Sequence, residues 1–171
     1  CGNDSWGQVS GVSGWTDIVD VAASYNHTLG LKSDGTVVGC GLDGDGQVST
    51  AETWSNIIQV AVGSYHSLGL HDDGTVSAVG NTTEEDYVSC VSSWSDIASL
   101  STLVAGYNLG LKTDGTVVAC GEDVHGDTKQ AADCANNSGW SNIKYIAAGW
   151  YNAYVKEDDG KAHACNGWED S

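Results

Sequence analysis

A segment of about 40 residues repeats along this chain, and the repeat constrains the fold more than any other feature of the sequence. Each copy opens with a tryptophan in the pattern W-[ST]-[DN]-I, at intervals of 39, 40 and 46 residues: Trp15, Trp54, Trp94 and Trp140. A fixed period of this length is typical of propellers, solenoids and other stacked arrays. We therefore expect a single repeat domain over residues 1–171, with a partial unit at 1–14 and full units at 15–53, 54–93, 94–139 and 140–171.

Within each unit the apolar residues alternate with a period of two, which predicts β-strands. In the first unit "IVDVAAS" is followed by "HTLGLK", in which His27, Leu29 and Leu31 are expected to point to one side. The following Asp-Gly in "SDG" is typical of a hairpin turn, and "TVVGCG" runs back as a third strand. The glycine-rich "LDGDGQVS" leads to a short fourth strand. We expect an all-β, propeller-like array of about four four-stranded antiparallel blades.

The stretch "VAASYNHTLGLKSDGTVVGCGLDGDGQVS" and its copies resemble the repeat of the regulator of chromosome condensation family. The resemblance covers almost the whole chain and implies an all-β propeller, usually of seven blades. Members of the family serve as binding platforms, and their roles range from nucleotide exchange on a small GTPase with chromatin docking to secreted inhibition of β-lactamase. Two departures are that the chain has no proline and that the fourth unit has "AYVK" where the first has "LGLK".

The two ends of the sequence are complementary. The N-terminal "CGNDSWGQVSGVSGW" aligns with "CGLDGDGQVSTAETW" at the end of the first unit, so we expect residues 1–14 to supply the last strand of a blade. The chain stops at "HACNGWEDS", where that strand would begin. Three alternatives stay open: the ends close a ring within one chain, the chain is part of a longer one, or each copy donates its strand to the next in a filament. The candidate residues of this seam are Cys1, Gln8, Val9, Cys165 and Trp168.

Six cysteines and four N-x-S/T sequons favour a secreted protein at an extracellular or cell-surface location. The candidate disulfide cysteines are Cys1, Cys40, Cys90, Cys120, Cys134 and Cys165. Candidate pairs are Cys1 with Cys165 at the seam and Cys120 with Cys134; a buried, unpaired cysteine is the alternative at positions 40, 120 and 165. The candidate N-glycosylation sites are Asn3, Asn26, Asn81 and Asn136.

The chain is strongly acidic, with 23 Asp and Glu residues against 6 Lys and Arg and a formal net charge of -17. This charge argues against nucleic acid as a partner, and no apolar run is long enough to insert in a membrane. His27 and His66 fall at the same position of two separate units, so we interpret both as structural. The spacings of zinc sites and of catalytic motifs are absent, and "LDGDGQ" is interpreted as a turn rather than a calcium loop. We expect no catalytic residue, cofactor or metal.

The sequence thus predicts a non-enzymatic extracellular repeat protein that acts as a structural or protein-binding scaffold. Its expected partners are proteins, including further copies of itself in a filament joined head to tail by strand complementation. The alternative is a soluble secreted monomer that binds or inhibits another protein. Fold alone does not decide between these functions.

Overall fold

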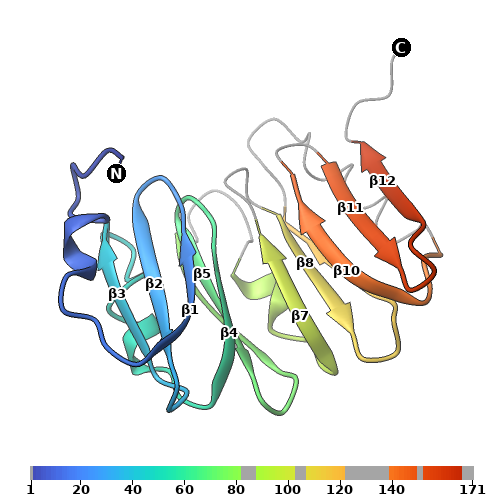
Figure 1. The fold of residues 1–171 in the computed structure, drawn as a ribbon, viewed down its shortest axis with the longest axis horizontal. Helices are drawn as coiled ribbons and strands as arrows, with labels where there is room; N and C mark the ends of the chain where they lie inside the picture. Colours follow the sequence, from blue (N-terminus) through green and yellow to red (C-terminus); the bar gives the residue numbers. More distant parts are fainter. Residues whose placement is uncertain (1, 82–87, 103–106, 122–138, 150–151, 167–171) are drawn as a thin grey trace.

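The computed structural model describes residues 2–81, 88–102, 107–121, 139–149 and 152–166, which form four three-stranded antiparallel sheets. Figure 1 shows the four sheets side by side in chain order, with β1 to β3 at one end of the array and β10 to β12 at the other. The main contacts between the described sheets join each sheet to the next one along the chain. The expected all-β, propeller-like array of antiparallel blades is confirmed.

Each sheet is a meander in which the middle strand pairs with both neighbours. Sheet 1 consists of β1 (Ile18–Ala23), β2 (His27–Lys32) and β3 (Val37–Gly41), and sheet 2 of β4 (Ile57–Val62), β5 (His66–His71) and β6 (Val76–Gly80). Sheet 3 consists of β7 (Ile97–Thr102), β8 (Asn108–Lys112) and β9 (Val117–Cys120), and sheet 4 of β10 (Ile143–Ala148), β11 (Asn152–Glu157) and β12 (Ala162–Asn166). Three short 3-10 helices precede sheets 1 to 3: η1 (Ser10–Val12), η2 (Ala51–Thr53) and η3 (Ser89–Val91).

The expected fourth strand of each blade is not found among the described residues, and the N-terminal segment forms turns and η1 instead of a strand. The side chain of Asp4 explains the difference, because its Oδ1 accepts hydrogen bonds from the backbone N–H groups of Val9 and Ser10 at 2.7 and 3.1 Å. A side chain that binds nearby backbone N–H groups competes with strand pairing. Asp43 makes the same two hydrogen bonds at the equivalent place before sheet 2.

The W-[ST]-[DN]-I motif fits a fixed conformation at the entry to each sheet. A Cβ atom on Gly30 would lie 2.8 Å from the ring of Trp15, so the tryptophan needs a glycine beneath it, and Trp54 packs on Gly69 in the same way. The Asp or Asn of the motif has a φ of 58 to 61°, in the left-handed region that these residues tolerate best after glycine: Asp17, Asn56, Asp96 and Asn142. The motif is therefore explained by local structure.

The Asp-Gly hairpin turns are confirmed, and they also connect neighbouring sheets. Gly35 has a φ of 79°, and the Oδ1 atom of Asp34 accepts a hydrogen bond from Thr36 N at 3.0 Å. The carbonyl of Gly35 in turn accepts a hydrogen bond from Ile57 N, at the start of sheet 2, at 3.0 Å. The turns at Gly74 and Gly115 make the same contact with the following sheet.

Alternate residues of each middle strand fill the space between sheets. Leu29 and Leu31 are 0 and 3% exposed and pack in one cluster with residues of sheet 2, which confirms the predicted orientation. Sheet 4 is different: its register places Tyr154 and Lys156 at the positions of these leucines. Both side chains are exposed, because sheet 4 has no following sheet among the described residues.

Candidate functional site

The outer face of sheet 1 exposes apolar side chains that the repeat buries elsewhere. Three valines on this face have exposed fractions of 36, 39 and 62%: Val9, Val12 and Val21. The residues at the same positions of the next unit are 7, 0 and 4% exposed: Val48, Ala51 and Val60. Half-buried Trp15 and Ile18 lie beside them over Gly30. We call this surface the open face (Val9, Val12, Trp15, Ile18 and Val21).

Hydrogen bonds hold the N-terminal segment on its own sheet. Gln8 is 5% exposed, its Nε2 donates to the carbonyl of Tyr25, and its own carbonyl accepts a hydrogen bond from Thr28 Oγ1, both at 2.9 Å. Of the predicted seam residues, Gln8 is therefore buried within its own chain and Val9 lies on the open face. This arrangement argues against donation of the segment to another copy. Cys165 is buried between sheets 3 and 4, and Cys1 and Trp168 lie outside the described residues.

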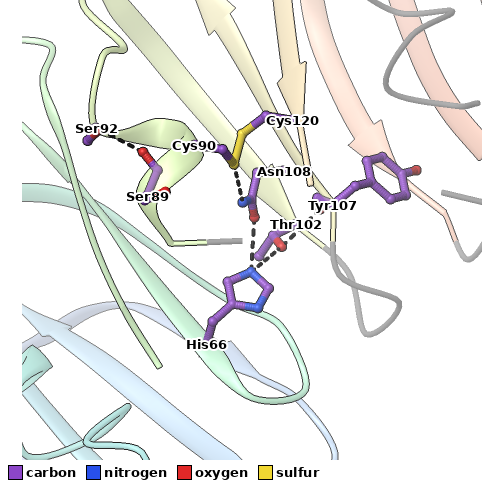
Figure 2. The surroundings of a disulfide bond; sticks show 8 residues. All are labelled: His66, Ser89, Cys90, Ser92, Thr102, Tyr107, Asn108 and Cys120. Atoms are coloured by element: carbon purple, nitrogen blue, oxygen red, sulfur yellow. Dashed lines mark hydrogen bonds between the residues drawn. A yellow bond between two sulfur atoms is a disulfide. The ribbon is translucent and has the colours of Figure 1, made fainter. Parts of the chain in front are cut away.

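The two repeated histidines bridge neighbouring sheets. The Nε2 atom of His27 lies 2.9 Å from Ser67 Oγ in sheet 2, and Ser67 Oγ donates to the carbonyl of Gln47 at 2.8 Å. The hydroxyl hydrogen of Ser67 is therefore used, so Nε2 of His27 is the donor. The Nε2 atom of His66 lies 2.9 Å from Asn108 Oδ1 in sheet 3, as Figure 2 shows.

Tyr107 takes the histidine position in the third unit and makes the same kind of bridge. Its hydroxyl donates to the carbonyl of Gly149, which follows β10, at 2.8 Å, and to that of Asn152, the first residue of β11. Burial raises the pKa of Tyr107, because the phenolate would lose its hydration. The three bridging residues, His27, His66 and Tyr107, thus link the whole array by polar contacts inside an apolar core.

The bridging histidines are suited to a structural role. Burial lowers the pKa of His27 and of His66 from 6.5 to about 4, because the protonated ring would lose its hydration. Both rings are therefore neutral at pH 7, and they are only 0 and 1% exposed. The prediction that these histidines belong to separate blades and serve the fold is confirmed.

The structure places one disulfide where the sequence did not suggest it. Cys90 in η3 is bonded to Cys120 at the end of β9, with their Cα atoms 6.0 Å apart (Figure 2). The suggested pairing of Cys120 with Cys134 is therefore wrong. Cys165 is also disulfide-bonded, and its partner lies outside the described residues. Cys40 is a half-buried free thiol that donates to the carbonyl of Gln8 at 3.6 Å, which agrees with the unpaired alternative for this residue.

Three of the four candidate N-glycosylation sites lie in the described part of the chain. Asn3 is exposed, Asn26 and Asn81 are partly buried, and Asn136 lies outside the described residues. Within the described part of the chain, no group of three or more His, Cys, Asp or Glu side chains is placed to hold a metal ion. The described residues also contain no helix that is long and apolar enough to cross a membrane.

Sequence reasoning missed the open face except for Val9. The signal was present in the alignment of the N-terminal segment with the end of the first unit, because that alignment pairs Val9 and Val12 with residues expected between two sheets. The alignment does not show whether these residues are exposed, because their exposure depends on which sheet packs against them. A separate groove near this face was also missed, and it is described below.

The sheets stack in chain order, and polar bridges join each of the first three to the next one. The first three sheets also have a tryptophan packed over a glycine. These features define this chain as a protein of β-propeller-type repeats. The family model described as "Regulator of chromosome condensation (RCC1) repeat" matches residues 18–47 and 57–84. These two segments therefore match the repeat of this family, which supports the resemblance found in the sequence. No curated protein matches the chain.

Solved structures with the same fold come from animals, fungi and plants. Human WBSCR16 superposes with a TM-score of 0.66 and 19% identity, over 87% of this chain and 47% of that one. Prp20p from Saccharomyces cerevisiae gives a TM-score of 0.60 and 20% identity, over 86 and 44% of the two chains. The CRINKLY WD40 ectodomain of the Arabidopsis thaliana receptor kinase ACR4 superposes with a TM-score of 0.70 and 17% identity, over 95% of this chain and 60% of that one. The chain thus spans about half the length of these proteins, and the likeness shows the fold.

Proposed function

We propose that the chain is a non-enzymatic extracellular scaffold that binds protein through the open face, and that its partner there is a second copy of the chain. The observation that carries the proposal is the exposure of Val21, which is 62% exposed while its counterpart Val60 is 4% exposed. Each internal sheet buries this position against its neighbour. A surface with the composition of a sheet-to-sheet contact is suited to receive another sheet.

The comparisons support a protein partner without identifying one. Prp20p binds Gsp1p and histones, and a solved structure shows Kap60 bound to it. A protein of similar fold therefore binds other proteins. The rings of His27 and His66 are neutral and only 0 and 1% exposed, so neither is accessible to a substrate as a general base. This burial supports a binding role rather than an enzymatic one.

The second copy would contribute the outer face of sheet 4, at the opposite end of the array (Figure 1). Two exposed tyrosines lie on this sheet, Tyr145 and Tyr154, with exposed fractions of 64 and 45%. The Lys156 ammonium lies 4.9 Å from the centre of the Tyr145 ring. Aromatic side chains are enriched at protein interfaces, so a head-to-tail contact would pack tyrosine rings on the valines of the open face. Such a contact needs no exchange of strands.

An extracellular location is supported by the cysteine chemistry. The disulfide between Cys90 and Cys120 would persist in an oxidising compartment but not in the cytosol. Intact mass of native material before and after reduction, together with its recovery from the medium or the cell surface, tests this part of the proposal. Recovery from the cytosol with all thiols reduced would contradict it.

The assembly is tested by light scattering at several protein concentrations, with two valine variants. Val21→Asp removes an apolar contact worth roughly 1.5–3 kcal/mol, so it should weaken association about tenfold or more. Val19→Asp is the matched control. Val19 is also 62% exposed, but its counterpart in sheet 2, Ile58, is 54% exposed although sheet 2 has a neighbour on each side, so this position takes no part in sheet-to-sheet contacts. The proposal requires larger species that Val21→Asp removes and Val19→Asp keeps.

A discrete wild-type species near 17.7 kDa at all concentrations would instead favour the alternative, a secreted monomer that binds another protein. One observation favours this alternative: the net charge of -17 makes copies repel each other. Light scattering at low and high salt separates the assembly from the monomer, because salt screens charge and would restore association only where charge repulsion opposes it.

A further inference from the structure

A groove on one edge of sheets 1 and 2 gathers aromatic and amide side chains. Its volume is about 350 Å³, within the range of pockets that bind small molecules. The N-terminal segment and the loops before β2 and β5 contribute its walls, among them Asn3, Trp6, Tyr25, Asn26, Ser64 and Tyr65. The three rings have exposed fractions of 57, 60 and 49%, in the order Trp6, Tyr25 and Tyr65. Three exposed rings around one groove are unusual on the surface of a soluble domain and suggest a ligand.

Hydrogen bonds fix the segments that carry these rings. The buried side chain of Gln8 accepts a hydrogen bond from Trp6 N at 3.0 Å and donates one to the carbonyl of Tyr25 at 2.9 Å. One amide therefore holds two of the ring-bearing segments at a set separation. The carbonyl of Tyr65 accepts a hydrogen bond from Asn81 N at 3.0 Å, which anchors the third. A site held in place before binding loses less entropy when a ligand arrives.

We infer that this groove binds a neutral saccharide. A sugar ring presents C–H groups on its faces and hydroxyls around its edge, so it needs flat apolar surfaces together with amides and hydroxyls. The groove has both, and the side chain of Asn26 makes no hydrogen bond within the described part of the chain. None of its lining residues is an acid, a lysine or an arginine. The net charge of -17 also opposes anionic ligands such as phosphates or acidic sugars.

A quaternary ammonium group is the competing ligand, since aromatic rings also attract cations. Such a group makes no hydrogen bonds, and it would leave the amides of Asn3 and Asn26 and the hydroxyl of Ser64 without a role. A groove of about 350 Å³ is also much larger than a trimethylammonium group fills. The polar lining therefore favours a saccharide, and the cation becomes an outcome of the test.

Binding is measured by saturation-transfer NMR and calorimetry on protein made in bacteria. This source matters because Asn3 and Asn26 also begin sequons, and a glycan on either would lie in the groove itself. The probes are neutral trisaccharides of glucose, mannose, galactose and N-acetylglucosamine, with choline as the cationic probe. At least one trisaccharide is expected to bind below about 10 mM, and Tyr25→Ala should weaken it roughly 5- to 10-fold, as expected for loss of one stacked ring.

The matched control is Ile58→Ala, which removes an apolar side chain that is 54% exposed and lies outside the groove, and it should leave binding within about twofold. Trp6→Ala and Tyr65→Ala provide second variants if Tyr25→Ala fails to fold by circular dichroism. Absence of binding by every trisaccharide overturns the inference, as does equal weakening by the control. Choline that binds more tightly than the trisaccharides, or displaces them, overturns it as well. None of these outcomes depends on the open face, so this inference and the proposed function fail separately.

Discussion

Lowering the pH is expected to destabilise the array through His27 and His66. Each ring has a pKa of about 4 when folded and about 6.5 when unfolded, so the unfolded chain binds more protons between these values. The stability that the neutral rings provide is therefore complete above about pH 6.5 and is lost as the pH falls towards about 4. The physical cause is that a buried imidazolium would have to form inside the core, next to the hydrogen bonds that join the sheets.

The size of the effect follows from the two pKa values. At about pH 5 each histidine contributes a loss of about 2 kcal/mol, and the pair about 4 kcal/mol, in the free energy of unfolding. With a urea dependence of about 2 kcal/mol per molar, the midpoint of urea unfolding should fall by about 2 M between about pH 7.5 and 5. Circular dichroism near 215 nm, where strands absorb, follows the transition.

Variants separate the histidines from the many carboxylates, whose protonation also changes the charge of the chain. His27→Gln and His66→Gln should each remove about half of the pH dependence. If the variants do not fold, the ring resonances of wild-type protein give both pKa values by NMR. Titration of either buried ring close to 6.5, or a urea midpoint that does not change with pH, would refute the reasoning.

Three further predictions concern the disulfide, the free thiol and the last sheet. Cys90→Ser removes a cross-link that spans 30 residues, worth about 3 to 4 kcal/mol, so its thermal midpoint should fall below that of oxidised wild type and stay above that of reduced wild type, which also loses the bond at Cys165; equal midpoints for oxidised wild type and variant contradict this. Gly11 faces Cys40 as Cys90 faces its partner, and a Cβ there would lie 3.0 Å from Cys40 Sγ and 2.5 Å from Cys40 Cβ. The segment must therefore move outwards by about 1 Å to reach the roughly 3.5–4.5 Å between Cβ atoms that a disulfide needs. Gly11→Cys should therefore protect Cys40 from alkylation as measured by intact mass, and a Cys40 that is still labelled refutes the pairing. The double variant Tyr154→Leu and Lys156→Leu places leucines at the positions that carry them in sheet 1, so the outer face of sheet 4 becomes apolar. This change should strengthen association and raise the apparent mass in light scattering at high concentration; an unchanged mass contradicts the proposed docking.

The repeat, the hairpin turns and the core face of the middle strand could be predicted because each depends on local sequence. Asp-Gly turns need a glycine with positive φ, which the sequence states directly, and Gly35 has a φ of 79°. The period of two placed Leu29 and Leu31 on one side, and the structure buries both. The recurrence of His27 and His66 at one position of separate units likewise indicated a structural role. A repeated position reports what each unit needs for folding.

The absence of the fourth strand could not be predicted from period and composition. "GQVS" alternates as a short strand would, but the decisive interaction is a side chain five residues earlier. Asp43 Oδ1 takes the backbone N–H groups of Val48 and Ser49, which a strand needs for its ladder. The sequence signal for this competition is an aspartate at the same position of both segments, Asp4 in the first and Asp43 in the second.

The disulfide was mispredicted because pairing depends on which segments meet across a sheet. Cys120 is nearer to Cys134 in sequence than to Cys90, which favoured the wrong partner. In the structure η3 packs against sheet 3, which brings Cys90 next to the end of β9. The same geometry brings Gly11 against Cys40 before sheet 1, where one of the two cysteines is missing. Comparison of units in three dimensions, rather than spacing, identifies the pair.

The two ends of the array differ at equivalent positions, and this difference bears on how copies would associate. At one end Val21 keeps the apolar character of a buried position although it is 62% exposed. At the other end Tyr154 and Lys156 replace the leucines that cover such a position inside the array. A polar outer face limits unintended stacking in repeat proteins. A head-to-tail contact would thus lack the leucines of an internal one, so we expect association that reverses on dilution rather than a permanent filament.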